Sequence, residues 1–176
     1  MREVQSIVDT FKQEEGPEVY DELPSIIRVL LSTDGTVTDI LEAWYNASIE
    51  VDKLAPIGAS VDNTQRCVIL RNSYNGMALL YASSRFNRDF ITKEQYEELM
   101  FTDKTIGREI ERIFGSTYRI IKDIRFVQPD TEDYSMIAQF LGAFSNDLYI
   151  YRVYNICSGD NVIVTITEVY NVRMYM

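Results

Sequence analysis

Residues 65–86 read QRCVILRNSYNGMALLYASSRF, and this stretch indicates the fold class most directly. Two runs rich in apolar and β-branched residues, at about 64–74 and 77–87, flank Asn75-Gly76, the strongest short-range signal for a β-hairpin. Similar runs lie at about 46–54, 117–128, 147–157 and 161–171, and SGDN (158–161) supplies a turn between the last two. We therefore expect an antiparallel sheet of about six strands.

Helical spacing marks the rest of the chain. Apolar residues recur at this spacing in 4–11, 26–31 and 37–44, with Gly16-Pro17 ending the first run, Pro24 preceding the second and the Thr36 hydroxyl placed to cap the third. KEQYEELMF (93–101) and TIGREIERIF (105–114) have helical patterning, and a further short helix is expected near SMIAQFLGAF (135–144). The prediction is a single α+β domain over residues 1–176, with N-terminal helices in 1–45 and a sheet with inserted helices in 46–176.

Composition excludes several classes of protein. The chain has 176 residues, of which 46% are hydrophobic and 25% charged, as in a globular domain with a sizeable core. A formal net charge of −10 disfavours a nucleic-acid binder, because phosphate contacts need a basic surface. The sequence contains no run of about 18 apolar residues, the length that a membrane-spanning helix needs, and its N-terminus lacks the apolar stretch of a signal peptide. We expect a cytoplasmic protein without membrane or nucleic-acid partners.

The chain contains no histidine, which removes the commonest metal ligand and every Ser-His or Cys-His nucleophile arrangement. The two cysteines, Cys67 and Cys157, are far apart, so we expect both to be reduced residues of the core. Neither a phosphate-binding loop nor a dinucleotide-binding glycine pattern is present. We therefore expect no metal and no cofactor, and any chemistry must use carboxylates, arginines or backbone groups.

Alternation in two strands singles out charged residues. In the last strand Glu168 shares a face with Val164, Ile166 and Tyr170, so its carboxylate points toward the more apolar side. A buried carboxylate indicates either a functional group or a structural ion pair, and spacing alone leaves both open. In 64–74, Arg66, Val68 and Leu70 lie on one face and Cys67, Ile69 and Arg71 on the other. One arginine therefore faces the core and the other faces solvent, and periodicity does not say which.

An inward Arg66 would suit a ligand carboxylate, and a surface salt bridge is the alternative. Arg85, across the Asn-Gly hairpin, is a second candidate of the same kind. Lys104 to Gly107 lies at a predicted helix start, where free amides and the positive end of the helix dipole favour an anion. Together these residues indicate a pocket for an organic anion.

The order of these motifs resembles that of the chorismate pyruvate-lyase family, in particular its divergent branch, from about Leu30 to Tyr170. LLSTDGTVTDILEAWY (30–45) is similar to the N-terminal helix pair of that family, and residues 65–86 resemble its central hairpin. Thr105-Ile106-Gly107 and the helix after it resemble a ligand-contacting segment, and SGDNVIVTITEVY (158–170) resembles the closing hairpin.

The resemblance implies a chorismate lyase-like fold and a cofactor-independent carbon-oxygen lyase that converts chorismate into 4-hydroxybenzoate and pyruvate. It implies that Arg66 and Glu168 are the catalytic residues, with Arg66 on the ring carboxylate and Glu168 on the oxygen-bearing ring carbon. It places Ile106, Gly107, Val37, Thr38 and Arg85 among the substrate-binding residues. Arg85 is included although it lies one residue away from the position at which the family would have a second ligand-facing arginine.

One departure from the family and one alternative function stay open. The segment from Tyr118 to Phe140 is longer than in the better-known members of the family. Ligand-sensing domains of some transcription regulators resemble the same fold and bind small organic acids without turning them over. A non-catalytic binding domain is therefore the alternative to a lyase, and the sequence leaves open whether the chain is a monomer or a homodimer.

Overall fold

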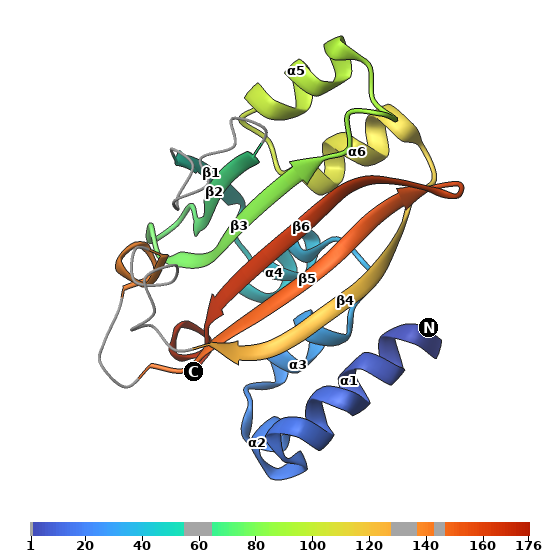
Figure 1. Ribbon diagram of the computed structural model, residues 1–176. Coiled ribbons are helices and arrows are strands. Elements are labelled where there is room, and N and C mark those ends of the chain that lie inside the picture. Colours follow the sequence, from blue (N-terminus) through green and yellow to red (C-terminus); the bar gives the residue numbers. More distant parts are fainter. Residues whose placement is uncertain (1, 55–64, 128–136, 143–146) are drawn as a thin grey trace.

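A computed structural model of the chain describes residues 2–54, 65–127, 137–142 and 147–176, with backbone only for 2–7, 15 and 17. Six strands form one fully antiparallel sheet in the order β1-β2-β3-β6-β5-β4 (Figure 1). The strands are β1 (Ile49–Leu54), β2 (Gln65–Asn72), β3 (Ala78–Phe86), β4 (Tyr118–Val127), β5 (Tyr149–Ser158) and β6 (Asn161–Asn171). The predicted α+β class and the strand positions are confirmed.

The two predicted hairpin turns join the strands as expected. Gly76, with φ +69°, follows Asn75 between β2 and β3, and its amide donates to the carbonyl oxygen of Asn72 at 2.8 Å. Gly159, with φ +56°, lies in the turn between β5 and β6. A positive φ strains residues with a Cβ atom, so these glycines allow both tight turns. The turns set the register that places even-numbered residues of β2, β3, β5 and β6 on one face of the sheet.

The helices agree with the predicted spacing, with two additions, a short helix at 17–22 and a 3-10 turn at 172–175. Pro17 was expected only to end the first helix, but it also begins a short second one, because proline is well tolerated in the first turn of a helix. The described side chains Val8 and Phe11 of the first helix are buried. The helices are α1 (Arg2–Glu15), α2 (Pro17–Glu22), α3 (Ser25–Ser32), α4 (Val37–Tyr45), α5 (Lys93–Phe101), α6 (Ile106–Phe114) and the 3-10 turn η1 (Val172–Tyr175).

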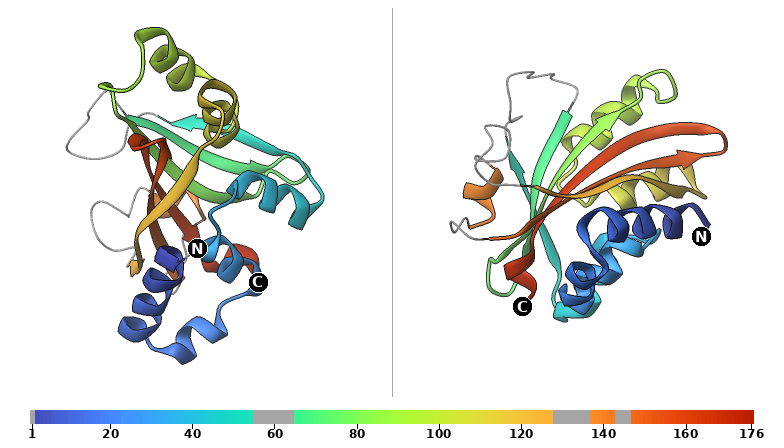
Figure 2. Two further views of the ribbon diagram at one scale, coloured as in Figure 1. Left: turned by 90° about the vertical axis from the view of Figure 1, so that its right-hand side faces the viewer. Right: turned by 60° about the horizontal axis from the view of Figure 1, so that its bottom comes forward.

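The core lies between the sheet and the N-terminal helices. Helices α1, α3 and α4 cover one face of the sheet, as the two views of Figure 2 show. On the opposite face, Ile137, Ala138 and Leu141 pack with Cys67, Ile69 and Tyr81 in a smaller cluster. Both Cys67 and Cys157 are buried and free. No helix in the described part of the chain is long and apolar enough to cross a membrane.

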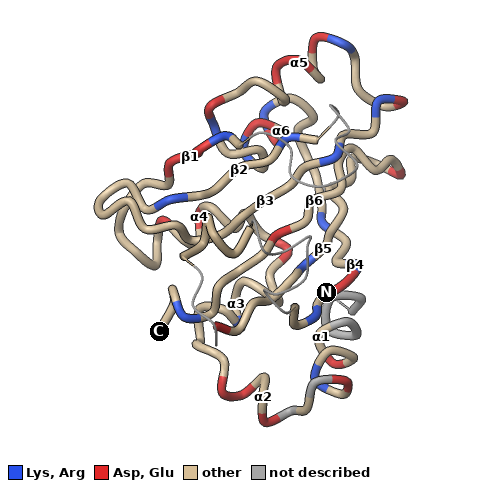
Figure 3. Tube along the Cα trace, turned by 60° about the vertical axis from the view of Figure 1, so that its left-hand side comes forward, with Lys and Arg blue, Asp and Glu red and all other residues tan. Residues whose placement is uncertain are grey.

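Helices α5 and α6 lie together at one end of the sheet (Figure 1). A capping box begins α5, since the Thr92 hydroxyl accepts from the Gln95 amide and the Gln95 side chain accepts from the Thr92 amide. Acidic residues are exposed on α2 and α5 (Figure 3), including Asp21, Glu94 and Glu97. Part of the negative charge of the chain is therefore carried on outer helices.

Candidate functional site

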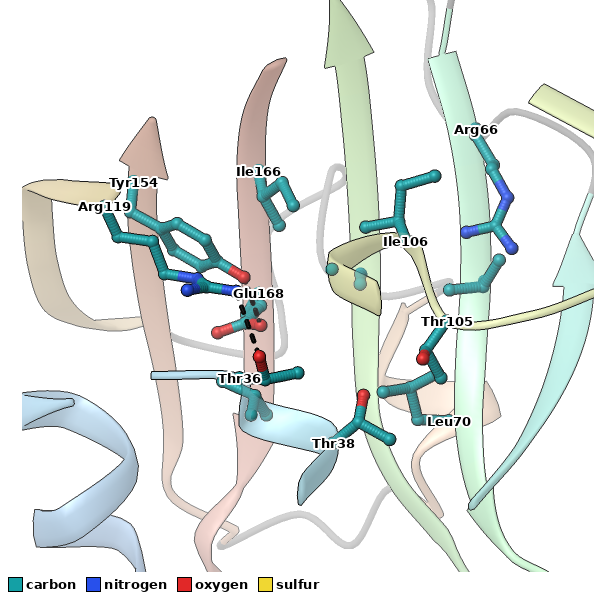
Figure 4. A pocket seen from close by; sticks show the side chains of 14 residues that line it. Thr36, Thr38, Arg66, Leu70, Thr105, Ile106, Arg119, Tyr154, Ile166 and Glu168 are labelled. Carbon is teal, nitrogen blue, oxygen red and sulfur yellow. Dashed lines mark hydrogen bonds between the residues drawn. The ribbon is translucent and has the colours of Figure 1, made fainter. Parts of the chain in front are cut away.

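A pocket lies between the helix-covered face of the sheet and the first residues of α4 and α6 (Figure 4). Strands β2 to β6 supply its floor, and the two helix starts supply its walls. The cavity volume that the centres of water molecules can occupy is about 40 Å³, which is room for a few waters. The lining residues are Thr36, Val37, Thr38, Arg66, Val68, Leu70, Ala82, Thr105, Ile106, Gly107, Arg119, Tyr154, Ile166 and Glu168.

Arg66 is the inward-facing arginine of β2 and is 4% exposed. Its Nη2 donates to the carbonyl oxygens of Thr102 at 3.1 Å and Lys104 at 2.9 Å, in the connection between α5 and α6. Its buried Nε has no hydrogen-bond partner among the described residues. Burial lowers the pKa of Arg66 to about 10, although the charge of Asp103 acts in the opposite direction. The guanidinium is thus a buried cation with donor capacity left for an anion. Arg71, on the other face, pairs with Asp52 at 3.2 Å.

Glu168 of β6 is 3% exposed and lies in a network of donors. Its Oε1 accepts from the Tyr154 hydroxyl at 2.9 Å, while Oε2 accepts from the Tyr170 hydroxyl and from Arg152 Nη1 at 3.3 Å. Burial, followed by the charge of Glu168, raises the pKa of both tyrosines well above its ordinary value, so both remain protonated donors. The structural ion pair that the sequence left open is therefore present, and the carboxylate lines the pocket as well.

Arg152 of β5 completes this network and is fully buried. Besides Glu168, it donates to the carbonyl oxygen of Thr33, and its guanidinium lies 4.7 Å from the ring centre of Tyr154. It alternates with Ile150 and Tyr154 along the strand, so the period of two that singled out Glu168 would also have found it. Arg152 is not among the lining residues, and its ion pair with Glu168 holds the carboxylate that does line the pocket.

The first residues of α4 and α6 line the pocket. Thr36 and Thr105 occupy the N-cap positions of α4 and α6, and neither side chain caps its own helix. The predicted capping role of the Thr36 hydroxyl is thus wrong: it donates to Glu111 Oε1 and accepts from Arg119 Nη2, each at 3.3 Å. The first amides of a helix have no partner within it, and the helix dipole favours an anion there.

The predicted binding residues of these helix starts, Val37, Thr38, Ile106 and Gly107, all line the same pocket as Arg66 and Glu168. At Gly107 an added Cβ would lie 3.3 Å from Nη2 of Arg119, so a glycine lets α6 approach that side chain closely.

Arg66 and Glu168 lie within reach of one small molecule. Strand β3 separates β2 from β6, so the two strands are about 10 Å apart, and the register offsets the two residues by about 7 Å along the strands. Both side chains project into the pocket from these positions, Arg66 on one side and Glu168 on the other (Figure 4).

Arg85 does not join them. It is exposed on the opposite face of β3, because Ala82 and Ser84 occupy the positions that face the pocket and a shift of one residue reverses the face. It lines a separate polar hollow together with Gln65, Ser83, Tyr151, Val153, Thr165 and Thr167. The expectation that Arg85 contacts the same ligand as Arg66 is therefore corrected.

Sequence reasoning missed Arg119 of β4, which is 8% exposed and lines the pocket. Its alternation with Ile121 was the available signal. The long segment from Tyr118 to Phe140 contributes β4 and helical residues 137–140, and its positions 128–136 lie outside the described residues. Within the described ranges, no cluster of Cys, Asp and Glu side chains is arranged to hold a metal ion.

The sheet order, with helices on one face and a pocket under two helix starts, defines an α+β domain of the chorismate lyase-like fold. The crystal structure of PhnF from Mycobacterium smegmatis superposes with a TM-score of 0.56 at 15% identity, covering 82% of this chain and 67% of that one. The effector domain of PhnF gives a TM-score of 0.53 at 18% identity, covering 78% of this chain and 88% of that one. These similarities concern the fold alone.

A relative in sequence defines the family. A protein of Methanocaldococcus jannaschii named "Putative lyase MJ0807" is 30% identical over 152 residues, which are 83% of this chain and 78% of that protein. The chain belongs to the family of this archaeal protein. No family model matches the chain.

Proposed function

We propose that this chain binds a small organic acid in the pocket between Arg66 and Glu168, and that the acid is chorismate, which it converts into 4-hydroxybenzoate and pyruvate. The observation that carries the proposal is that two buried charged side chains face each other across one pocket. One is Arg66, whose Nε has no hydrogen-bond partner among the described residues, and the other is Glu168, whose carboxylate is held by hydrogen bonds. The name of the archaeal relative, "Putative lyase MJ0807", supports the class of reaction.

The free hydrogen-bonding positions determine which groups fit at each end. Arg66 Nε and the first amides of α6 are donors, so they suit a carboxylate. At the other end Oε2 of Glu168 already accepts from Arg152 and Tyr170, whereas Oε1 accepts from Tyr154 alone. Oε1 therefore retains one acceptor position, which selects a hydroxyl donor on the ligand. Between the two ends, Val68, Ala82 and Ile166 offer an apolar surface to a ring.

The proposed reaction asks little bond chemistry of the protein. In chorismate the C3–O bond to the enolpyruvyl group breaks, the C4 hydrogen leaves as a proton, and the ring becomes aromatic. The methylene carbon of the released enolpyruvate takes up a proton to give pyruvate, so the atoms balance. The protein supplies placement and charge complementarity, which dominate when no covalent nucleophile is required.

Ligand entry must enlarge the pocket. The 40 Å³ now open to water centres is well below the about 150 Å³ of a cavity that binds benzene. Arg66 on β2 and Ile106 at the start of α6 both line the pocket. We expect these side chains to shift when the acid binds and to enclose it afterwards.

A second candidate function is binding without turnover. Two observations favour it: the fold is similar to that of the effector domain of PhnF, and the Glu168 carboxylate already accepts from three donors. A carboxylate held in this way is suited to orienting a hydroxyl and less suited to carrying a proton. The two candidates share the same pocket and the same residues.

Incubation of the purified chain with chorismate separates them. The lyase releases pyruvate, followed with lactate dehydrogenase, together with an equal amount of 4-hydroxybenzoate, followed by ultraviolet absorbance. Saturable binding of chorismate in calorimetry without pyruvate release indicates the binding domain. Arg66→Gln should abolish either activity, and Arg85→Gln on the opposite face is the matched control. Absence of both binding and pyruvate release would refute the proposed function.

A further inference from the structure

A second cation of the pocket, Arg119, has no role in the function proposed above. Its side chain is 5% exposed, its Nη1 donates to the carbonyl oxygen of Asp34 at 2.9 Å, and its Nη2 contacts Thr36 Oγ1 at 3.3 Å. Figure 4 shows Arg119 beside Tyr154 on the Glu168 side of the pocket, while Arg66 lies on the other side. The two arginines are therefore separated across the pocket and cannot serve the same ligand group.

The charges of the lining match a dianion. Arg66, Arg119 and Glu168 are its charged members, and Arg152 already neutralises Glu168 in a buried pair. The excess of positive charge thus comes from two arginines, one at each side, supplemented by the helix starts of α6 and α4. A ligand with one carboxylate would leave the second buried arginine without an anionic partner in the pocket.

The current acidic partner of Arg119 is a weak competitor. Nη2 of Arg119 and Oε1 of Glu111 are 3.5 Å apart, and the Glu111 side chain is 44% exposed. An ion pair of this length that reaches solvent contributes little, because water screens it. A ligand carboxylate inside the pocket would meet the same guanidinium from the desolvated side, where the attraction is stronger.

We infer that Arg119, with the Thr36 hydroxyl and the first amides of α4, forms a second anion subsite, and that the pocket takes ring acids with two carboxylates. One carboxylate lies on the ring at Arg66, and the other lies on a substituent next to the hydroxyl that faces Glu168. This inference rests on the proposed function, because it uses the same pocket and the same ring orientation.

Two stable probes that differ in one group test the subsite. Vanillate carries a methoxy group beside the 4-hydroxyl, and 3-(carboxymethoxy)-4-hydroxybenzoate carries a second carboxylate at that place. Calorimetry with the full chain should give a dicarboxylate affinity at least about tenfold above that of vanillate. Arg119→Gln should remove this preference while changing vanillate binding less than about threefold, and Arg66→Gln should weaken both probes. Arg85→Gln should change neither.

A surface variant keeps the test decisive if Arg119→Gln does not fold. Glu111→Gln removes the competing carboxylate from an exposed position and should tighten the dicarboxylate by about threefold without affecting vanillate. Equal affinities of the wild type for the two probes would overturn the second subsite, while vanillate binding that depends on Arg66 would leave the proposed pocket intact. If neither probe nor chorismate binds, both the subsite and the proposed function fail.

Discussion

The buried pair of Arg152 and Glu168 offers the sharpest test of how the pocket is built. The two side chains are 0% and 4% exposed, with Nη1 and Oε2 3.3 Å apart. Glu168→Gln keeps the shape of the side chain and its contacts with the tyrosines, but it leaves a cation buried without an anionic partner. Arg152→Met keeps most of the stem volume and leaves the carboxylate with hydroxyl donors only.

Each single substitution should lower the free energy of unfolding by about 3 kcal/mol, the usual cost of breaking a buried pair by removing one partner. The double variant leaves no unpaired charge, so it should be less destabilised than the sum of the two, with a coupling energy of about 2 kcal/mol. The exposed pair Lys93–Glu97, at 3.7 Å, provides the matched control. Glu97→Gln should cost less than about 0.5 kcal/mol, because solvent screens that pair.

Urea unfolding followed by far-ultraviolet circular dichroism measures the free energy of unfolding of the wild type and of the four variants. Additive losses in the double variant, or a loss below about 1 kcal/mol for Glu168→Gln, would refute the claim that Glu168 is held by a strong buried pair. The result also bears on turnover. Glu168→Gln lacks the carboxylate, so its activity under conditions in which circular dichroism shows a folded chain separates a chemical role of Glu168 from loss of fold.

Three further predictions concern other groups. Because the pKa of Arg66 is lowered to about 10, its positive charge is lost as the pH rises through that value. In calorimetry, the affinity for the organic acid should therefore not change around neutral pH and should fall by about tenfold per pH unit above pH 10. Burial raises the pKa of Tyr154, Tyr170 and Tyr175 well above its ordinary value, so these three side chains should not ionise at about pH 11 in a titration at 295 nm, about one unit above the ordinary pKa of tyrosine. Since these phenols ionise more readily in the unfolded chain, stability present below about pH 10 should decline above it. Thr92→Ala removes the capping box of α5 and should cost about 1 kcal/mol in the same urea experiment.

Local signals were sufficient for most of the fold. Asn75-Gly76 and the SGDN turn both fix two-strand hairpins, and the period of two then gives the face of every residue in them. The order β3-β6 at the centre of the sheet is a long-range pairing that no local pattern reports. Helix α2 was missed because a Gly-Pro pair can end one helix and start another, and only tertiary packing of Tyr20 and Leu23 decides between them.

The candidate site was predictable where alternation acts within one strand and not where strands must be aligned. Periodicity placed Arg66 with Val68 and Glu168 with Ile166, and the structure brings both to one pocket. Whether Arg85 or Arg119 faces that pocket depends on the register of β3 and β4 relative to their neighbours. A shift of one residue excludes Arg85, so the second cation comes from a strand that the motifs did not mark.

The distribution of charge bears on whether such a site turns its ligand over or only holds it. Chorismate enters as a dianion, and the proposed elimination divides that charge between two monoanions. A pocket with Arg66 on one side and Arg119 on the other meets both charges of the substrate, but each product retains only one of these contacts. Each product is therefore held less tightly than the substrate, which favours release after the reaction. A sensor of the same fold has no such asymmetry, because its ligand leaves as it entered. An affinity for 4-hydroxybenzoate as high as that for the dicarboxylate probe would accordingly favour binding over turnover.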